Sequence, residues 1–292
     1  MRLENKYLAV QSLNDKRGYP IATLCDILAL NRSSYYKWRR RDTSEHEAKD
    51  SELIDCIYSI QRDVNGIYGY RRMQMNLSRR FGLHCNKKRV YRVMRAIGMK
   101  SVIRRKRPSY KKSTPEITAE NSLERKFTAD NVNEKWLTDV TEFKYGNGGG
   151  KLYLSAILDL CDNGIIAYKV GSSNNNSLAF ETFDAAVRKY SDAKPLFHSD
   201  RGYQYTSKAF RAKLDAQGIT QSMSRVGRCI DNGPMEAFWG ILKSEMYYLR
   251  KFGDAESLQT AIDKYIDFYN HRRYQAKLGG LAPMEFRRNM VT

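Results

Sequence analysis

The sequence predicts an α/β protein in which a mixed β-sheet covered by helices follows an all-α, strongly basic N-terminal part. Near residue 128, segments with helical spacing of apolar residues give way to β-rich, alternating segments. The 292 residues also include 51 Lys and Arg against 32 Asp and Glu, a net charge of +19. Such a surplus on a folded chain indicates a polyanionic partner, most often nucleic acid, although a merely basic protein of ribosomal type stays open.

Composition narrows the class of protein further. Hydrophobic residues make up 41% of the chain and aromatic residues 12%, enough for true cores, and the length predicts two or three domains. The five cysteines include no CxxC pair, which argues against a zinc framework and favours a reduced cytoplasm. The N-terminus lacks the long apolar run of a signal peptide or anchor, and no window approaches a membrane span. We therefore expect a cytoplasmic protein without membrane association.

The first predicted domain, residues 1–50, contains a helix-turn-helix pattern in YPIATLCDILALNRSSYYKWRR (19–40). Apolar residues follow helical spacing after Pro20, a short turn comes next, and a second helix covers residues 33–40. This arrangement makes Arg32 and Lys37 available to phosphates or base edges. A two-helix hairpin without a DNA-binding role is the alternative interpretation.

A second helical DNA-binding segment is predicted over residues 51–103, followed by a basic linker at 104–127. From residue 86 to residue 112 the chain carries twelve basic residues and no acidic one. Charged helix faces normally carry both signs, so a single sign predicts phosphate contacts that depend strongly on salt. The candidate DNA contacts in the helices are Arg71, Arg72, Lys87, Lys88, Arg89 and Arg92, and those in the linker are Arg104, Arg105, Lys106 and Arg107.

The catalytic core is predicted over residues 128–250, with a C-terminal helix and tail at 251–292. Three strands, at 135–145, 151–162 and 164–171, come first, with YGNGGGK as the first turn. A helix (177–192), a short strand (195–200), a helix (207–218) and a fifth strand (219–224) follow. This order, a five-stranded mixed sheet covered by helices, matches a ribonuclease-H-like fold.

Three acids occupy positions where sites form in such sheets. Asp139 lies inside the first strand, Asp200 ends the fourth strand, and Glu236 lies on the helix DNGPMEAFWGILKSE (231–245), with Lys243 on the same helix face. Three converging carboxylates would repel one another unless cations were bound, and Mg²⁺ or Mn²⁺ prefers such oxygen ligands. Two such ions about 4 Å apart would serve in-line phosphodiester displacement.

Other acids compete for the same role, because 32 acids give many triples by chance. We rank them lower: Asp231 resembles a helix cap, Asp162 lies in a turn, and Glu142 and Glu245 are expected to face solvent. The remaining rival is Asp159.

Two further polar groups have competing interpretations. His198, Ser199 and Asp200 suggest a hydrolase triad, but neighbouring residues of a strand point to opposite faces and cannot form one. His198 is therefore expected to orient Asp200 or to pack near the site. Arg272 and Arg273, at the end of a C-terminal helix, would either contact DNA or favour the helix C-terminus.

Four stretches carry a family resemblance: WLTDVTEF (136–143), FHSDRGYQYTS (197–207), SRVGRCIDNGPMEAFWGILKSE (224–245) and YNHRRYQAKLGGLAPMEF (269–286). Their order, with 35 residues between Asp200 and Glu236, closely resembles the integrase-like DDE transposases of bacterial insertion sequences. The resemblance covers nearly the whole chain. Within that family, the chain looks like the second-frame product of elements that encode their transposase in two overlapping reading frames.

The resemblance implies an enzyme that binds the terminal inverted repeats of its element and catalyses DNA 3′-end cleavage and strand transfer. Asp139, Asp200 and Glu236 would hold two Mg²⁺ or Mn²⁺ ions, and Lys243 would contact the DNA backbone. The implied partners are duplex DNA, further copies of the chain, and the upstream-frame helix-turn-helix and coiled-coil product, in the nucleoid-associated bacterial cytoplasm. The alternatives are a catalytically inactive or partner-dependent DNA-binding regulator, and a ribonuclease-H-like nuclease that cuts without joining.

Overall fold

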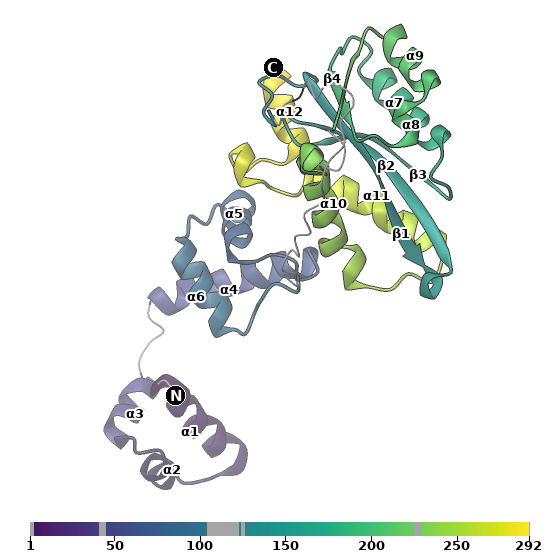
Figure 1. The fold of residues 1–292 in the computed structure, drawn as a ribbon. Coiled ribbons are helices and arrows are strands. Elements are labelled where there is room, and N and C mark those ends of the chain that lie inside the picture. The colour runs from purple at the N-terminus through teal and green to yellow at the C-terminus, as the bar shows by residue number, and fades with distance from the viewer. Residues whose placement is uncertain (1–2, 41–44, 104–122, 124–125, 225–228, 292) are drawn as a thin grey trace. The chain divides into compact units, whose positions relative to one another are not determined.

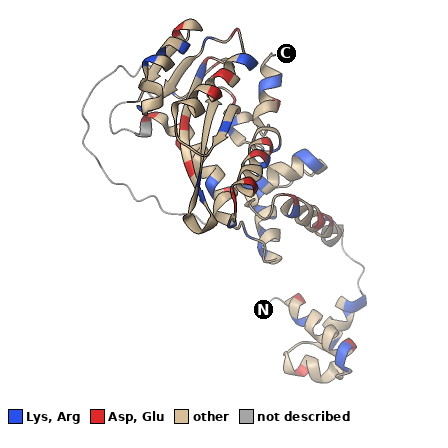
Figure 2. Ribbon diagram, turned by 90° about the vertical axis from the view of Figure 1, so that its right-hand side faces the viewer, with Lys and Arg blue, Asp and Glu red and all other residues tan. Residues whose placement is uncertain are grey.

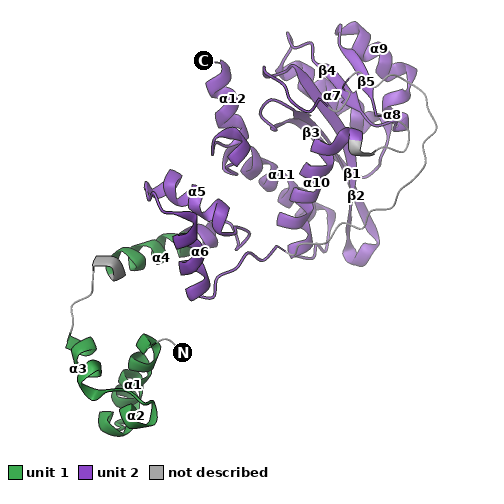
Figure 3. Ribbon diagram, turned by 60° about the vertical axis from the view of Figure 1, so that its left-hand side comes forward, with its two compact units in different colours: residues 1–59 green, residues 60–292 purple. Residues whose placement is uncertain are grey.

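The structure is a computed structural model that describes residues 3–40, 45–103, 123, 126–224 and 229–291. It divides into two compact units, residues 1–59 and 60–292 (Figures 1 and 3). The division falls within helix α4 (Glu45–Asp63).

The first unit contains three short helices around a small core. They are α1 (Leu3–Arg17), α2 (Ile21–Ile27) and α3 (Arg32–Arg40). The two helices of the predicted helix-turn-helix are present as α2 and α3, whereas α1 was not predicted. Helix α1 contributes Tyr7 and Val10 to a core that also contains Leu24, Cys25 and Tyr35. Helix α1 therefore completes a core that α2 and α3 alone could not enclose.

The second unit begins with a helical hairpin formed by α5 (Tyr70–Phe81) and α6 (Lys87–Ala96). Gly82 ends α5 in the left-handed conformation, with φ of 66°, and the Asn86 side chain accepts a hydrogen bond from the Lys88 amide to cap α6. Five apolar residues of the two helices are buried, whereas Phe81, at the end of α5, is 41% exposed. The buried residues are Met73, Leu77, Val90, Val93 and Met94.

A five-stranded mixed sheet forms the centre of this unit, which confirms the predicted fold class. Its strands are β1 (Lys135–Tyr145), β2 (Gly150–Asp159), β3 (Ile165–Gly171), β4 (Leu196–Ser199) and β5 (Thr220–Met223). Their order is β3-β2-β1-β4-β5. The first three strands form an antiparallel meander, and β4 and β5 add in parallel beside β1.

Helices cover both faces of the sheet (Figure 1). On one face α10 (Gly233–Glu245) and α11 (Ala255–His271) pack against Leu137 and Phe143 of β1. On the other face α7 (Asn176–Lys189) and α9 (Lys208–Ala216) pack against Trp136. Residues of β1 thus alternate between two cores, as the pleat of a strand requires. The short helix α8 (Tyr203–Thr206) connects β4 to α9.

The C-terminal helix α12 (Pro283–Val291) is tied to the turn after β2 through a buried cluster of charges. Arg287 Nη1 lies 2.9 Å from Asp159 Oδ2 and 2.7 Å from Asp162 Oδ2, and both aspartates are fully buried. Burial and the neighbouring Asp159 charge raise the pKa of Asp162 to about 6. Asp159 and Asp162, which we considered as alternative catalytic acids, therefore have a structural role in joining the C-terminal helix to the sheet.

Among the described residues, none of the helices combines the length and the apolar character needed to span a lipid bilayer.

Candidate active site

Asp139 lies in the middle of β1 on the face covered by α10. The backbone amide of Val140 donates a hydrogen bond of 2.8 Å to its Oδ1, and the Trp239 indole donates one of 3.0 Å to its Oδ2. Trp239 comes from α10, and its ring is 6% exposed. The orientation of this carboxylate is therefore fixed by one contact from its own strand and one from the helix above it.

Asp200 is placed beside Asp139 by the parallel pairing of β4 with β1. Leu137 pairs with His198, so the residues two positions further along each strand lie at the same end of the sheet. The Gly202 amide donates a hydrogen bond of 2.9 Å to Asp200 Oδ1. A Cβ atom on Gly202 would lie 2.7 Å from Gln204 Oε1 and 3.0 Å from Asp200 Oδ1, so glycine leaves room for both side chains.

Glu236 lies in the first turn of α10 and is exposed. The start of this helix is fixed to β1, because the Asn232 side chain donates a hydrogen bond of 3.0 Å to the Thr138 carbonyl. Asn232 occupies the N-cap position without a capping hydrogen bond from its side chain. Asp231, predicted to cap the helix, is instead fully buried, with its charge acting on His198.

The three acids act on one another electrostatically. Burial, together with the carboxylates of Asp200 and Glu236, raises the pKa of Asp139 to about 6, against the opposing effect of the two N–H donors. Across the described ranges, no three His, Cys, Asp or Glu side chains already converge on one metal position. The three acids are thus gathered at one end of the sheet without closing around a common point. Oxygen-only donors of this kind match the preference of hard divalent cations.

Lys243 extends from α10 toward the same region. Its Nζ lies 5.2 Å from the centroid of the Phe143 ring. Burial lowers its pKa, and the carboxylates of Asp139 and Glu142 act in the opposite direction. Lys243 is therefore a half-buried cation at the edge of the acidic site, on the helix face that its seven-residue spacing from Glu236 predicted.

The prediction that Glu245 faces solvent is wrong. Its side chain is only 3% exposed and forms ion pairs with Arg273, at 2.8 Å, and with Arg72, at 3.0 Å. Nine residues separate it from Glu236, which places the two on opposite sides of a helix with 3.6 residues per turn. The same pairs involve two candidate DNA contacts: Arg273 is buried against Glu245, and Arg72 is half-buried and paired with the same carboxylate. Glu142, by contrast, is 34% exposed and pairs with Lys151.

His198 packs near the site and does not form a catalytic triad. Its Nδ1 lies 2.9 Å from the Ser222 hydroxyl and its Nε2 3.1 Å from the Ser224 hydroxyl, so both ring nitrogens are occupied. Burial lowers the pKa of His198 to about 4. The Ser199 hydroxyl donates to the Asp200 carbonyl and not to the imidazole. Of the two roles considered for His198, packing is the one observed.

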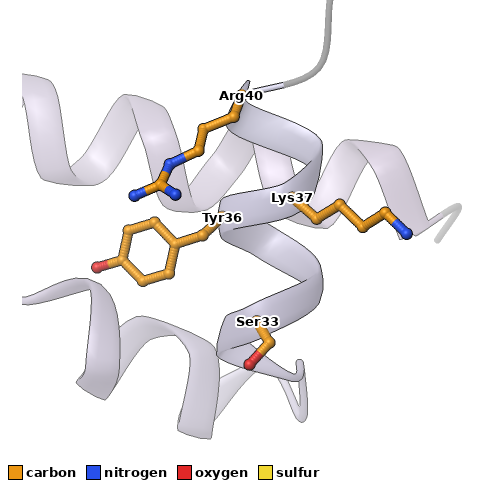
Figure 4. Close-up of a pocket in the computed structure, with 4 residues that line it drawn as sticks. All are labelled: Ser33, Tyr36, Lys37 and Arg40. Atoms are coloured by element: carbon orange, nitrogen blue, oxygen red, sulfur yellow. The ribbon is translucent and has the colours of Figure 1, made fainter.

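The predicted DNA contacts differ in their exposure to solvent. Figure 2 marks the lysines and arginines in blue along the ribbon. On α3, Arg32 and Lys37 are exposed. Lys37 lines a surface hollow together with Ser33, Tyr36 and Arg40 (Figure 4). In the α5–α6 hairpin, the exposed residues are Arg71, Lys87, Lys88 and Arg92, whereas Arg72 and Arg89 are half-buried. The linker candidates Arg104, Arg105, Lys106 and Arg107 lie outside the described residues.

Sequence reasoning missed three residues that contribute to these regions. Trp239 lies three residues after Glu236, one helical turn along the same face, so helical spacing could have placed it near the acids. Tyr36 and Arg40 are four residues apart on α3, so they share one helix face, and both line the same hollow as Lys37. Helical spacing was the available signal in both cases.

Comparison with known proteins gives the following similarities. Two family models described as "Integrase core domain" match residues 129–229 and 236–291, and one described as "HTH-like domain" matches residues 47–107. A putative transposase, InsK, for insertion sequence element IS150 of Escherichia coli K12 is 39% identical over 94% of this chain and 96% of its own length. An uncharacterised transposase-like protein of Haemophilus influenzae is 44% identical over 73% of this chain and 98% of its own.

Among solved structures, the catalytic core domain of HTLV-2 integrase, in complex with magnesium, aligns with a TM-score of 0.42 and 21% identity. The alignment covers 54% of this chain and 98% of the viral domain.

Proposed function

Because the chain belongs to the insertion-sequence transposases with an integrase core, we propose that Asp139, Asp200 and Glu236 are the catalytic carboxylates of a DNA-cleaving and strand-transferring enzyme. The observation that carries this proposal is the position of the acids: Asp139 and Asp200 lie at the same end of the paired strands β1 and β4, and Asn232 fixes to β1 the start of the helix that carries Glu236. The charges of Asp200 and Glu236 add to burial in raising the pKa of Asp139, and a perturbed carboxylate beside other acids is typical of catalytic sites.

The donor set fits divalent metal, which the integrase-type DDE family generally uses. Asp139, Asp200 and Glu236 would hold the ions, and we propose two Mg²⁺ or Mn²⁺ ions per site. When bound, such ions activate an attacking oxygen and stabilise a leaving oxygen in phosphodiester displacement. The protein's own contribution is to hold the Asp139 carboxylate in one orientation through Trp239, and to offer Lys243 to the phosphate backbone.

The proposed reaction has two displacements at phosphorus. In the first, the oxygen of water forms a bond to a phosphate at the element's end, and the bond between that phosphorus and the 3′ oxygen breaks, which frees a 3′-OH. In the second, this 3′-OH forms a bond to another phosphate, and that phosphate releases its own 3′ oxygen. Neither step needs a covalent bond to the protein. This agrees with the hydrogen bonds that engage both ring nitrogens of His198 with the hydroxyls of Ser222 and Ser224.

The DNA partner is proposed to be the terminal inverted repeats of the element, held by the exposed basic residues of α3 and α6. Two ends must be brought together, so we infer at least a dimer on DNA. We further propose that the chain is a second-frame product that works with the upstream-frame product in the bacterial cytoplasm, associated with the nucleoid. The domain limits 1–50, 51–103, 104–127, 128–250 and 251–292 remain predictions.

The test is strand transfer with Mg²⁺ on a labelled duplex end of the element, comparing the native chain with Glu236→Gln. The matched control is Glu256→Gln, because Glu256 is also an exposed glutamate in the first turn of a helix, α11. We expect joined products from the native chain and the control, and none from Glu236→Gln. Joined products from Glu236→Gln would refute the assignment of this carboxylate, and cleavage without joining by the native chain would indicate a nuclease.

A further inference from the structure

Glu245, at the last turn of α10, is the centre of a buried network of polar groups. Arg273 donates to both of its oxygens, with Nε 2.9 Å from Oε2 and Nη2 2.8 Å from Oε1, and the Tyr265 hydroxyl donates a third hydrogen bond of 2.9 Å. Although burial acts to raise the pKa of Glu245, the hydrogen bond and charge of Arg273 and the charge of Arg72 hold it below its ordinary value. Glu245 is therefore a buried anion with several donors, as such a group requires.

One member of the network comes from a distant part of the sequence. Arg72, in the first turn of α5, donates a hydrogen bond of 3.0 Å to Glu245 Oε1 across 173 positions of the chain. Its guanidinium also lies 5.3 Å from the centroid of the Tyr68 ring. The basic hairpin is thereby tied directly to the helix that carries Glu236.

Further contacts join the same two parts of the unit. The rings of Tyr68 and Phe268 of α11 have their centroids 6.5 Å apart. At the other end of α5, the Arg79 guanidinium lies 5.2 Å from the centroid of the Tyr274 ring and pairs with Glu285. Arg72 and Arg79 are about 10 Å apart along the helix axis, because each residue adds about 1.5 Å. Two separated attachments fix the orientation of α5 as well as its position.

We propose that Arg72 and Glu245 are positioning residues that set where DNA held by the α5–α6 hairpin meets the catalytic carboxylates. Glu245 lies about 13 Å along α10 from Glu236, since nine residues separate them in a continuous helix. One rigid helix thus carries a catalytic acid at its first turn and the attachment of the hairpin at its last turn. This inference rests on the proposed function and adds that the cut position depends on this ion pair.

The neighbouring Arg71 provides a control that distinguishes a positioning residue from a DNA contact. Arg71 is exposed, and its guanidinium lies 5.7 Å from the ring centroid of Tyr70, free of the network. Adjacent residues on a helix point about 100° apart, so one arginine can face DNA while the next faces the core. The Arg72 guanidinium is held by Glu245 and lies beside the Tyr68 ring, so a phosphate contact would have to break these contacts.

The experiment compares Arg72→Gln with Arg71→Gln in full-length protein. The probe is a labelled duplex that the native chain selects from a randomised pool. Neutralising a phosphate contact lowers the dependence of log affinity on log salt concentration by about one. We expect this decrease for Arg71→Gln and an unchanged dependence for Arg72→Gln. An equal decrease in both variants would overturn the proposal by identifying Arg72 as a DNA contact.

Cleavage of the same duplex with Mg²⁺ then tests positioning. We expect the native chain and Arg71→Gln to nick at one phosphodiester, and Arg72→Gln to spread its nicks over neighbouring positions. Arg72→Lys, which keeps the charge, should narrow the distribution again. A merely structural role would lower the yield without moving the cut, so a single unchanged nick position in Arg72→Gln would refute the inference.

Hydrogen exchange of the DNA-free protein separates this inference from the proposed function. If the native chain cleaves no duplex, the proposed function fails, but the attachment of α5 can still be measured. Arg72→Gln should then accelerate amide exchange in α5 while leaving β1 and β2 unchanged. Unchanged exchange in α5 would show that the ion pair does not hold the hairpin, and would refute the inference by itself.

Discussion

Trp239 offers a direct test of how the site is held together. Its indole N–H is the contact through which α10 fixes the Asp139 carboxylate, at 3.0 Å. Trp239→Phe keeps an aromatic ring in the same core but removes this donor. Trp136 of β1 provides a matched control. It is also buried, and its indole donates a hydrogen bond of 3.3 Å to Asn133 Oδ1, but it lies on the opposite face of the sheet from Asp139.

The expected magnitude follows from the nature of the bond. A hydrogen bond to a charged group contributes about 1.5–3 kcal/mol. If that free energy holds Asp139 in its oriented, ionised state, its loss lowers the cleavage rate about ten- to 150-fold. Both substitutions remove the same atoms from a buried position, so we expect similar decreases in the free energy of unfolding. Only the Trp239 variant should lose activity beyond what stability explains.

The assay is Mg²⁺-dependent nicking of a labelled duplex at saturating DNA, together with urea unfolding of each variant. We expect Trp136→Phe to nick at close to the native rate and Trp239→Phe to be slowed by the factor above, with DNA affinity unchanged in both. The reasoning is refuted if Trp239→Phe nicks at the native rate, or if the two variants are slowed equally.

Three further substitutions test other parts of the structure. Glu245→Gln should lower the free energy of unfolding by about 3–5 kcal/mol at neutral pH, because it breaks a buried ion pair. Since the pKa of Glu245 is lowered in the folded protein, this stabilisation is present above the unfolded pKa near 4.3 and is lost as the pH falls below it. Urea unfolding should therefore show the stabilities of the native and variant proteins converging at acid pH. Arg287→Met leaves two buried aspartates unpaired and should lower the free energy of unfolding by about 3–5 kcal/mol, and a native-like denaturation midpoint would contradict this. Gly202→Ala places a Cβ 2.7 Å from Gln204 Oε1 and 3.0 Å from Asp200 Oδ1 and should slow nicking about 100-fold, which fails if the variant is fully active.

Local pattern in the sequence was sufficient to predict the elements of the core. The β-rich segment at 135–145 predicted β1 with its observed limits, and the order of strands and helices predicted a five-stranded mixed sheet. Asp139 and Asp200 were placed near each other because one lies within a strand and the other ends a strand. These features repeat over a few residues, so neighbouring side chains and backbone preferences specify them.

Contacts between distant segments were decided only by the tertiary structure. The helix pattern alone predicts Glu245 as a surface residue, but it is buried because Arg273, just after α11, and Arg72 of α5 pair with it. The Trp239 indole likewise finds its acceptor 100 positions away in β1. Whether a charged side chain is solvated or buried depends on which opposite charges the fold brings to it, because burial of an unpaired charge is too costly to occur. That information lies in the path of the whole chain and not in the periodicity of any one helix.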